Sequence, residues 1–350
     1  MQFYQLDPTQ DPRWVELLLH HSSASVFHSV PWLNALQRTY DYRPVVFTTS
    51  PPDSQLKNGM LFCHVKSMLT GHRLVSLPFS DHCEPLFESP RNVDSFVPYL
   101  QTEQRQNHWK YVEVRPVNVN FAQTDAHSGF GDESNYFLHT LDLRPDLDTL
   151  FLGFDKSSVQ RRVRRAQQAS LVERCGHSED LLHEFYRLLV MTRRRHRVPP
   201  QPLSWFRNLI QSQGDALEIR LACRDENSIA AILTLRFKDI VYYKYGCSDA
   251  RFNRFGGTPW LFWNAIAAAK SSGAIKFDFG RTEEDNPGLL AFKNHWVPSP
   301  HRLVYWRFPA NARSFGSAEC WKLKAAKHVF SRMPDPLLTV AGRLFYRHLG

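Results

Sequence analysis

Three apolar segments between residues 217 and 247 limit the folds open to this chain more than any other feature. They read "LEIRLAC", "IAAILTLRF" and "IVYYKYGC", and only "RDENS" and "KD" separate them. β-Branched and aromatic residues favour strands, and connections this short join neighbouring antiparallel strands. The sequence therefore predicts a three-stranded antiparallel meander.

Helical and strand patterns flank this meander in a definite order. Before it, Val159, Val163 and Ala166 share one helical stripe, and Ser178 can cap a helix that ends before Pro199. The expected elements outside the meander are helix 156–169, strand 170–175, helix 178–198, helix 203–213, helix 259–272, strand 275–279, helix 288–295 and strand 302–308.

This order resembles the acyltransferase fold of the GNAT superfamily. The first half of the chain shows a similar order, with helices near 12–21, 31–39 and 92–107 and strands near 44–49, 59–68, 73–79, 110–117 and 136–143. The resemblance implies an α+β fold, a tandem duplicated GNAT fold with mixed, mostly antiparallel sheets flanked by helices. It implies a GNAT-like domain at 1–150, a catalytic GNAT-like domain at 151–310 and a basic, amphipathic helical tail at 311–350.

Composition agrees with a globular chain of about two domains. The 350 residues are 43% hydrophobic, and the formal net charge is +9. Residues 156–197 hold eleven Lys/Arg against four Asp/Glu, and residues 311–350 hold seven against two. These basic segments could meet RNA, a phosphate-bearing substrate or an anionic membrane, or they could be solvated helix faces.

Several functional classes find no support in the sequence. No leader peptide and no long apolar run is evident, so neither a signal peptide nor a spanning helix is expected. The six cysteines show no C-x-x-C spacing, which favours buried thiols in a cytoplasmic protein. H-E-x-x-H, G-x-S-x-G and P-loop motifs are missing from the sequence, which disfavours zinc hydrolases, serine esterases and P-loop enzymes. We expect no metal site.

The segment "RFNRFGGTPW" carries a signal for anion binding. Gly256 and Gly257 permit close backbone approach, Thr258 is a good N-cap, and Pro259 fits the first helical position. Unpaired amides would then point out of the helix start. The segment resembles the pyrophosphate loop of GNAT enzymes, led by Arg251 or Arg254, which implies acyl-CoA as a co-substrate. The alternative is a glycine loop that caps an ordinary helix.

The segment "FDFGRTEEDNPGLLAFKNHW" is the candidate reaction centre. Lys293 can place a positive charge where the oxyanion of acyl transfer develops, and Phe292 and Trp296 would exclude water. Asp278 is either a general base or the partner of Arg281 in a buried ion pair. Lys293 could instead extend over aromatic surface without a catalytic role.

These residues resemble the Fem aminoacyltransferases and the related BioF2-like acyltransferases. The likeness rests on "SSVQRRVRRA" with "LVER", on "VYYKYGCS", and on the segment from 277 to 296. It implies that Phe292 and Lys293 belong to the reaction centre and that Tyr245 binds substrate. Leu36, Gln201 and Trp205 stand where bridge-forming members carry diphosphate-binding groups, so we expect a substrate other than a nucleotide-linked muramyl peptide.

The remaining substrate-binding candidates come from several segments. Asp81 and His82 in "SLPFSDHCEPLF" either face substrate or belong to a polar structural turn. The full set of candidates is Tyr243, Tyr245, Arg281, Arg161, Arg165, Asp81, His82 and Trp205.

The tail contains Trp321, Ala325, Val329, Leu337, Leu338 and Phe345 among basic residues. It could lie on an anionic inner leaflet, but packing on the second domain is the favoured interpretation.

We therefore expect an enzyme that transfers an acyl group onto an amine of a cell-envelope or exopolysaccharide precursor, with acyl-CoA as donor. Two alternatives are an enzyme that uses aminoacyl-tRNA as donor, supported by the basic helix, and a non-catalytic protein that binds RNA or membranes. DNA is not an expected partner.

Overall fold

The structure of the protein is a computed structural model, and it describes residues 1–89, 92–121, 129–310, 330 and 333–349. The described residues form two compact units. The first takes residues 1–135, 303–310 and 343–349, and the second takes residues 136–302, 330 and 333–342.

The first unit is built on a mixed sheet with the strand order β1-β2-β3-β4-β5-β12. β4 and β5 are parallel, and the other neighbours are antiparallel. These strands are β1 (Tyr4–Leu6), β2 (Arg43–Thr48), β3 (Met60–Ser67), β4 (Gly71–Ser76), β5 (Val112–Val114) and β12 (His301–Phe308), of which β12 belongs to this unit from Leu303 onward.

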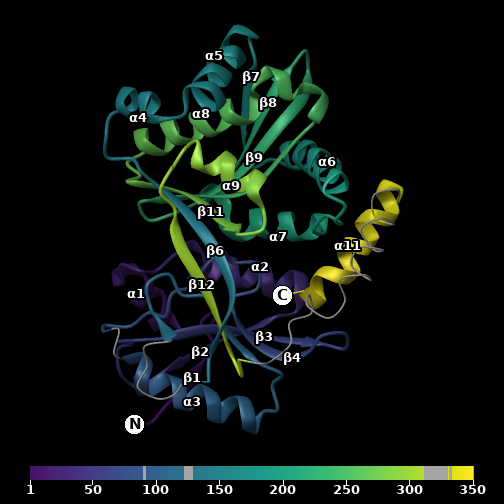
Figure 1. Ribbon diagram of the computed structural model, residues 1–350. Coiled ribbons are helices and arrows are strands. Elements are labelled where there is room, and N and C mark those ends of the chain that lie inside the picture. Colours follow the sequence, from purple (N-terminus) through teal and green to yellow (C-terminus); the bar gives the residue numbers. More distant parts are fainter. Residues whose placement is uncertain (90–91, 122–128, 311–329, 331–332, 350) are drawn as a thin grey trace. The chain divides into compact units, whose positions relative to one another are not determined.

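Three helices cover the first sheet: α1 (Pro12–His20), α2 (Val30–Tyr40) and α3 (Val93–Gln106). α3 lies on one side of the strands, and α1 and α2 lie on the other (Figure 1). Side chains of Asp11 and Ser29 cap α1 and α2, each followed by a proline in the first turn. α3 buries Phe96, Val97 and Leu100 against the sheet.

The second unit has the strand order β6-β11-β10-β9-β8-β7, and its strands match the predicted meander closely. They are β6 (Gly131–Asp142, in this unit from Tyr136), β7 (Val172–Gly176), β8 (Leu217–Arg224), β9 (Asn227–Phe237), β10 (Ile240–Ser248) and β11 (Lys276–Glu283). β10 and β11 are parallel, whereas the pairs β6–β11, β9–β10, β8–β9 and β7–β8 are antiparallel.

Helices cover both faces of this second sheet. α5 and α8 lie on one side, and α6 and α7 lie on the other (Figure 1). The helices are α4 (Leu147–Gly153), α5 (Arg161–Gln168), α6 (Glu179–Arg195), α7 (Leu203–Gln213), α8 (Gly257–Ser271) and α9 (Pro287–Asn294), and a π-helical turn at Lys156–Gln160 precedes α5. The Ser178 hydroxyl accepts from the Leu181 amide, as predicted for a cap of α6.

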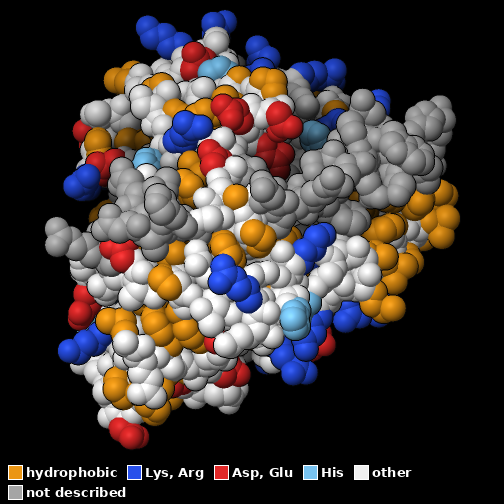
Figure 2. Space-filling view, turned by 60° about the horizontal axis from the view of Figure 1, so that its bottom comes forward, with side chains coloured by type: hydrophobic (Ala, Val, Ile, Leu, Met, Phe, Trp, Pro, Cys, Tyr) orange, Lys and Arg blue, Asp and Glu red, His pale blue; other side chains and the backbone are white. Residues whose placement is uncertain are grey.

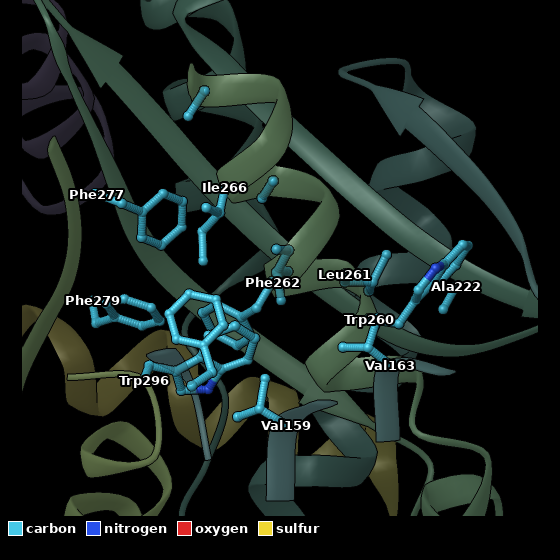
Figure 3. Packing of buried hydrophobic residues seen from close by; sticks show 14 of the residues in the cluster. Val159, Val163, Ala222, Trp260, Leu261, Phe262, Ile266, Phe277, Phe279 and Trp296 are labelled. Carbon is cyan, nitrogen blue, oxygen red and sulfur yellow. The ribbon is translucent and has the colours of Figure 1, made fainter. Parts of the chain in front are cut away.

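The core beneath α8 is predominantly aromatic. Phe262 of α8 lies among Phe277 and Phe279 of β11 and Trp296 after α9 (Figure 3). Its ring centroid is 5.4 Å from that of Phe279 and 5.6 Å from that of Trp296. Such ring packing contributes beyond area burial, so it fixes α9 against β11.

Two strands differ from the sequence prediction in the sheet they join. Strand 302–308 was expected to end the second domain, but β12 pairs with β5 of the first unit. Strand 136–143 was expected in the first domain, but β6 pairs with β11 of the second unit. The physical reason lies in the side chains, because Arg307 pairs with Glu113 at 2.7 Å and Leu143 packs in the core of the second unit.

Three smaller expectations have mixed outcomes. Of the expected tail, residues 311–329 and 331–332 lie outside the described residues, and α11 (Asp335–Leu349) is helical. Four described cysteines are buried, whereas Cys175 on β7 is exposed, contrary to the prediction. Within the described residues, no helix combines the length and the apolar character that crossing a bilayer requires.

Candidate functional site

A cavity of about 320 Å³ in the second unit collects several of the predicted site residues. It lies between the segment before α5, the start of α8 and the helix α9. Predicted residues Gly257, Thr258 and Phe292 line it. The remaining lining residues are Ser158, Val159, Arg162, Ile229, Ala230, Ser248, Phe252, Asn253, Pro259, Gly288, Ala291, His295 and Trp296.

The start of α8 forms one wall of this cavity. The helix begins at Gly257, one residue before Thr258, and Gly256 is the N-cap with a φ of +75°. Thr258 is therefore not the N-cap that the sequence predicted. A Cβ on Gly256 would also clash with the carbonyl oxygen of Arg162. Both the positive φ and this clash therefore require glycine at position 256.

The backbone at this helix start suits an anion. The amides of Gly257 and Thr258 belong to the first turn, where no intrahelical acceptor exists. The partial positive charge of the helix N-terminus adds to them. This wall can therefore bind phosphate oxygens.

Arg162 on α5 lines the same cavity. The predicted Arg161 and Arg165 are exposed on α5 and do not line it. Arg165 donates to the Arg254 carbonyl at 3.3 Å, and the Arg254 guanidinium lies 4.9 Å from the ring of Phe255. The α5 arginine that lines the cavity is thus one that the sequence reasoning missed.

The wall formed by α9 is aromatic. Phe292 and Trp296 line the cavity and pack on the ring of Phe262. Trp296 is buried, and its Nε1 has no hydrogen-bond partner among the described residues. These rings place apolar surface beside the helix start, as predicted.

Lys293 lies behind this wall, at a bulge in β11. The side chain is only 2% exposed, and its Nζ donates to the carbonyl oxygens of Gly280 and Arg281, both at 2.8 Å. Gly280 has a φ of +71°, and its amide donates to Asp278 Oδ1 at 2.6 Å. Lys293 and Asp278 therefore both fix the backbone of this bulge, and Lys293 is not among the lining residues of the cavity.

β10 and β11 are paired only over a short length beside this bulge. The parallel pairing runs from Ile240 to Tyr242, and β10 has its own irregularity between Tyr243 and Tyr245. In α/β sheets, ligands often bind beyond such strand ends.

His139 of β6 is a buried neighbour of the bulge that the sequence reasoning missed. Its Nε2 lies 2.8 Å from Asn294 Oδ1, and its Nδ1 is buried without a partner among the described residues. Burial lowers the pKa of His139, and the nearby Lys293 ammonium lowers it further, against the opposing effect of Asn294 and Asp278. His139 lies in a regular strand without a motif around it, so the sequence gave no sign that it lies near the site.

The predicted aromatic substrate residues lie on opposite faces of the sheet. Tyr243 packs on Phe262 at 4.6 Å, on the α8 side. Tyr245 accepts a hydrogen bond of 2.9 Å from Trp205 Nε1 and packs on Phe206, on the α7 side. Neither tyrosine lines the cavity, and Trp205 is fully buried.

The last candidates also lie away from the cavity lining. The Arg281 guanidinium lies 4.3 Å from the Tyr136 ring. In the first unit, the Asp81 carbonyl accepts from the Tyr305 hydroxyl at 2.6 Å, and the buried His82 ring packs on Phe27 at 5.2 Å. Their predicted roles toward substrate remain predictions.

A second cavity of about 390 Å³ lies beside the C-terminal half of α8, and none of the predicted site residues lines it. No group of His, Cys, Asp or Glu that could hold a metal is found within the described ranges.

Comparisons with known proteins support the fold. Residues 155–294 match the model of the acetyltransferase (GNAT) domain, Acetyltransf_6. The crystal structure of FemX is similar with a TM-score of 0.67 and 13% identity over 88% of this chain and 97% of that chain. A search of curated proteins found no match.

Two further solved structures are similar in fold. L-PGS from Bacillus licheniformis has a TM-score of 0.58 and 15% identity over 93% of this chain and 98% of that chain. A tandem GNAT protein from the clavulanic acid biosynthesis pathway has a TM-score of 0.56 and 12% identity over 89% of this chain and 99% of that chain.

The fold is therefore a tandem GNAT fold of mixed, mostly antiparallel sheets flanked by helices, as the sequence predicted. Residues 155–294 match a GNAT acetyltransferase domain, and the likeness to FemX concerns the fold.

Proposed function

We propose that this protein is an acyltransferase that moves an acyl group from acyl-CoA onto an amine of a cell-envelope or exopolysaccharide precursor. The observation that carries the proposal is the cavity that Gly257, Thr258, Arg162 and Phe292 line together.

The donor is argued from the chemistry of this cavity. A pyrophosphate needs several convergent donors and positive charge, which the helix start and the guanidinium supply. An acyl chain needs an apolar wall, which Phe292 and Trp296 supply. Acyl-CoA combines both groups, and a GNAT acetyltransferase domain implies the same donor.

The reaction breaks the thioester C–S bond and forms an amide C–N bond. The attacking amine must lose a proton, and the leaving thiolate must gain one. The bulge held by Lys293 and Asp278 lies between β10, which leads to the glycine loop, and α9, which carries Phe292. We propose that Lys293 fixes this backbone and adds positive charge near the developing oxyanion.

The acceptor is argued from likeness alone. The sequence resembles the Fem aminoacyltransferases, FemX has a similar fold, and another similar structure is the C-terminal domain of a putative lysylphosphatidylglycerol synthetase from Agrobacterium fabrum, with a TM-score of 0.58. The Fem resemblance of the sequence and the lysylphosphatidylglycerol in the name of the second protein support an envelope precursor as acceptor here.

A charge placed at the helix start tests the donor proposal. We expect Thr258→Asp to raise the Kd for acetyl-CoA at least about tenfold, because a carboxylate would repel the phosphates. The same carboxylate favours the first turn of a helix, so the Tm should stay equal or rise. Calorimetric titration gives the Kd, and release of free thiol with a panel of amines gives the activity.

Ser204→Asp is the matched control, because Ser204 is exposed at the same second position of α7, outside the cavity. If both variants bind acetyl-CoA like the wild type, the proposed pyrophosphate site is wrong.

Aminoacyl-tRNA is a second candidate donor, and the surface of α5 favours it. Arg161, Arg162, Arg164 and Arg165 are all exposed, while Val163 and Ala166 are buried beneath them. Four guanidinium groups on two helical turns are a suitable surface for an RNA backbone. The donor question then depends on whether transfer requires acyl-CoA or charged RNA.

RNA binding is measured over a series of salt concentrations with the double variant Arg161→Ala, Arg164→Ala. If tRNA is the donor, the affinity of the wild type falls steeply with salt and the variant shows a smaller slope. Weak binding with no change in slope contradicts this second candidate.

A further inference from the structure

The exposed side of α11 carries an apolar ridge. Leu337, Val340 and Leu344 are 57%, 52% and 62% exposed, and their spacing places them on one face of the helix. Leu338, the next residue after Leu337, is buried. Single exposed hydrophobic residues are common, but a row of them on one helix is not accounted for by packing.

The turn between β3 and β4 lies beside the last turn of α11. Met68 is fully exposed and Leu69 is 59% exposed. The flanking residues hold the end of α11, because Ser67 Oγ lies 3.0 Å from His348 Nδ1 and the Thr70 hydroxyl donates to the His348 carbonyl at 3.0 Å. The β3–β4 turn and the part of α11 from Arg343 onward belong to the first unit, so the turn and the end of the helix form one surface, whereas Leu337 and Val340 belong to the second unit.

The apolar residues gather rather than scatter. We name the part of this surface in the first unit the α11 patch, with Met68, Leu69, Leu344 and Phe345 as its apolar residues. These are four of the twelve exposed large hydrophobic residues in the described part of the chain. Figure 2 shows hydrophobic side chains along the right-hand edge, the side on which α11 lies in Figure 1, with basic side chains beside them.

The charge around the α11 patch is positive. Arg343 and Arg347 are exposed beside Leu344, and Lys66 and Lys110 are exposed around the turn. Asp335 is the sole acidic residue in the sequence of α11, at the far end of the helix, where it pairs with Arg194. A partner of this surface should therefore combine negative charge with an apolar phase.

We infer that the α11 patch docks onto the surface of an anionic lipid bilayer. An amphipathic helix with an apolar ridge and flanking arginines lies in the headgroup region, where its apolar side chains reach the acyl chains. A second copy of the chain would bring arginines against arginines. An RNA backbone would leave the exposed leucine and methionine side chains without apolar contact.

Flotation with lipid vesicles tests this inference on the full chain. We expect the protein to float with phosphatidylcholine vesicles that contain phosphatidylglycerol. With vesicles of phosphatidylcholine alone, it should stay in the bottom fraction of the gradient. Leu344→Glu should abolish flotation. Leu19→Glu is the matched control, because Leu19 is 66% exposed on α1, outside the patch, and this variant should float like the wild type.

A charge variant separates the two contributions to binding. Arg343→Ala with Arg347→Ala should weaken binding on the order of 25-fold, since each basic residue near an anionic surface contributes about fivefold. Arg38→Ala with Arg105→Ala removes the same charge from exposed positions of α2 and α3 and should leave binding unchanged. Circular dichroism confirms that each variant is folded.

Three results would overturn the inference. One is failure of the wild type to float with anionic vesicles. Another is equal flotation of Leu344→Glu and Leu19→Glu. The third is a wild-type protein that sediments as a dimer while Leu344→Glu sediments as a monomer. That result would assign the patch to a contact with a second copy of the chain.

Discussion

Lys293 Nζ lies 2.8 Å from the carbonyl oxygen of Gly280, the residue at which β11 departs from its regular pairing with β6. A buried ammonium group is costly unless hydrogen bonds compensate for its lost hydration. Two carbonyl oxygens of the bulge provide that compensation. The lysine and the bulge therefore stabilise one another.

This relationship predicts the effect of removing the ammonium group. Lys293→Met keeps the length of the side chain and leaves two buried carbonyl groups without their donor. We expect the free energy of unfolding to fall by about 1–3 kcal/mol, measured by urea denaturation. Acyl transfer should fall with it, because the bulge lies next to the cavity.

Lys276→Met is the control for that experiment, because Lys276 is exposed on the same strand. Its stability should stay within about 0.5 kcal/mol of the wild type. If transfer survives intact in Lys293→Ala while RNA or vesicle binding depends on Arg161, Arg164 and Arg165, the enzymatic role of this site is wrong.

A second prediction concerns the backbone at the cavity. Gly256→Ala introduces both a strained φ and a clash with the Arg162 carbonyl, so it should lower the Tm and weaken acetyl-CoA binding. Gly273 has a similar φ of +82°, but nothing lies within 4 Å of an added Cβ. Gly273→Ala should therefore cost only the φ strain and leave binding unchanged. Equal effects of both substitutions on binding would exclude a role for the Gly256 loop.

A third prediction distinguishes two neighbouring arginines. Arg162→Ala should raise the Kd for acetyl-CoA about tenfold or more, the size expected for one charge-assisted hydrogen bond. Arg161→Ala should leave that Kd unchanged, because Arg161 does not line the cavity. Calorimetric titration of both variants checks the difference, and the reverse order of effects would contradict our assignment of the donor site.

A fourth prediction follows from a buried carboxylate in the first unit. Burial alone would raise the pKa of Glu113, but Arg115 and Arg307 outweigh it and bring the pKa down to about 2 from the ordinary 4.5. As the pH falls, the unfolded chain takes up this proton first. The stabilisation is thus complete above pH 4.5 and is lost between pH 4.5 and 2.

The loss should be on the order of 3 kcal/mol, from the difference between the two pKa values. Glu113→Gln should be less stable at neutral pH, because two buried guanidinium groups lose their partner. Its stability should also change less steeply with pH in this window, and an equally steep change would contradict the assignment. Urea denaturation at several pH values measures both effects.

The fold was largely predictable because hydrophobic periodicity and turn residues act locally. The meander and the helices α6 and α7 match the predicted ranges closely, since Ser178, Pro199 and the turns at 224–228 and 238–239 define their ends. The exchange of β6 and β12 was not predictable, because strand patterns do not show which sheet a strand joins. Only the Arg307–Glu113 pair and the aromatic core reveal that choice.

The candidate site was predictable only in part. The glycine loop and Phe292 were found because glycine and aromatic residues stand out in the sequence. Arg162 was missed because four similar arginines lie on α5, and only the packing of Val159 and Val163 decides which one meets the cavity. The faces on which Tyr243 and Tyr245 lie depend on the irregularity between them, which alternation cannot reveal.

A crystal structure with acetyl-CoA tests the central claim most directly. Our account predicts the pyrophosphate oxygens within hydrogen-bond distance of the Gly257 and Thr258 amides and of the Arg162 guanidinium, with the acyl group directed toward Phe292. A complex in which the pyrophosphate lies elsewhere, with the cavity at the start of α8 empty, would contradict it.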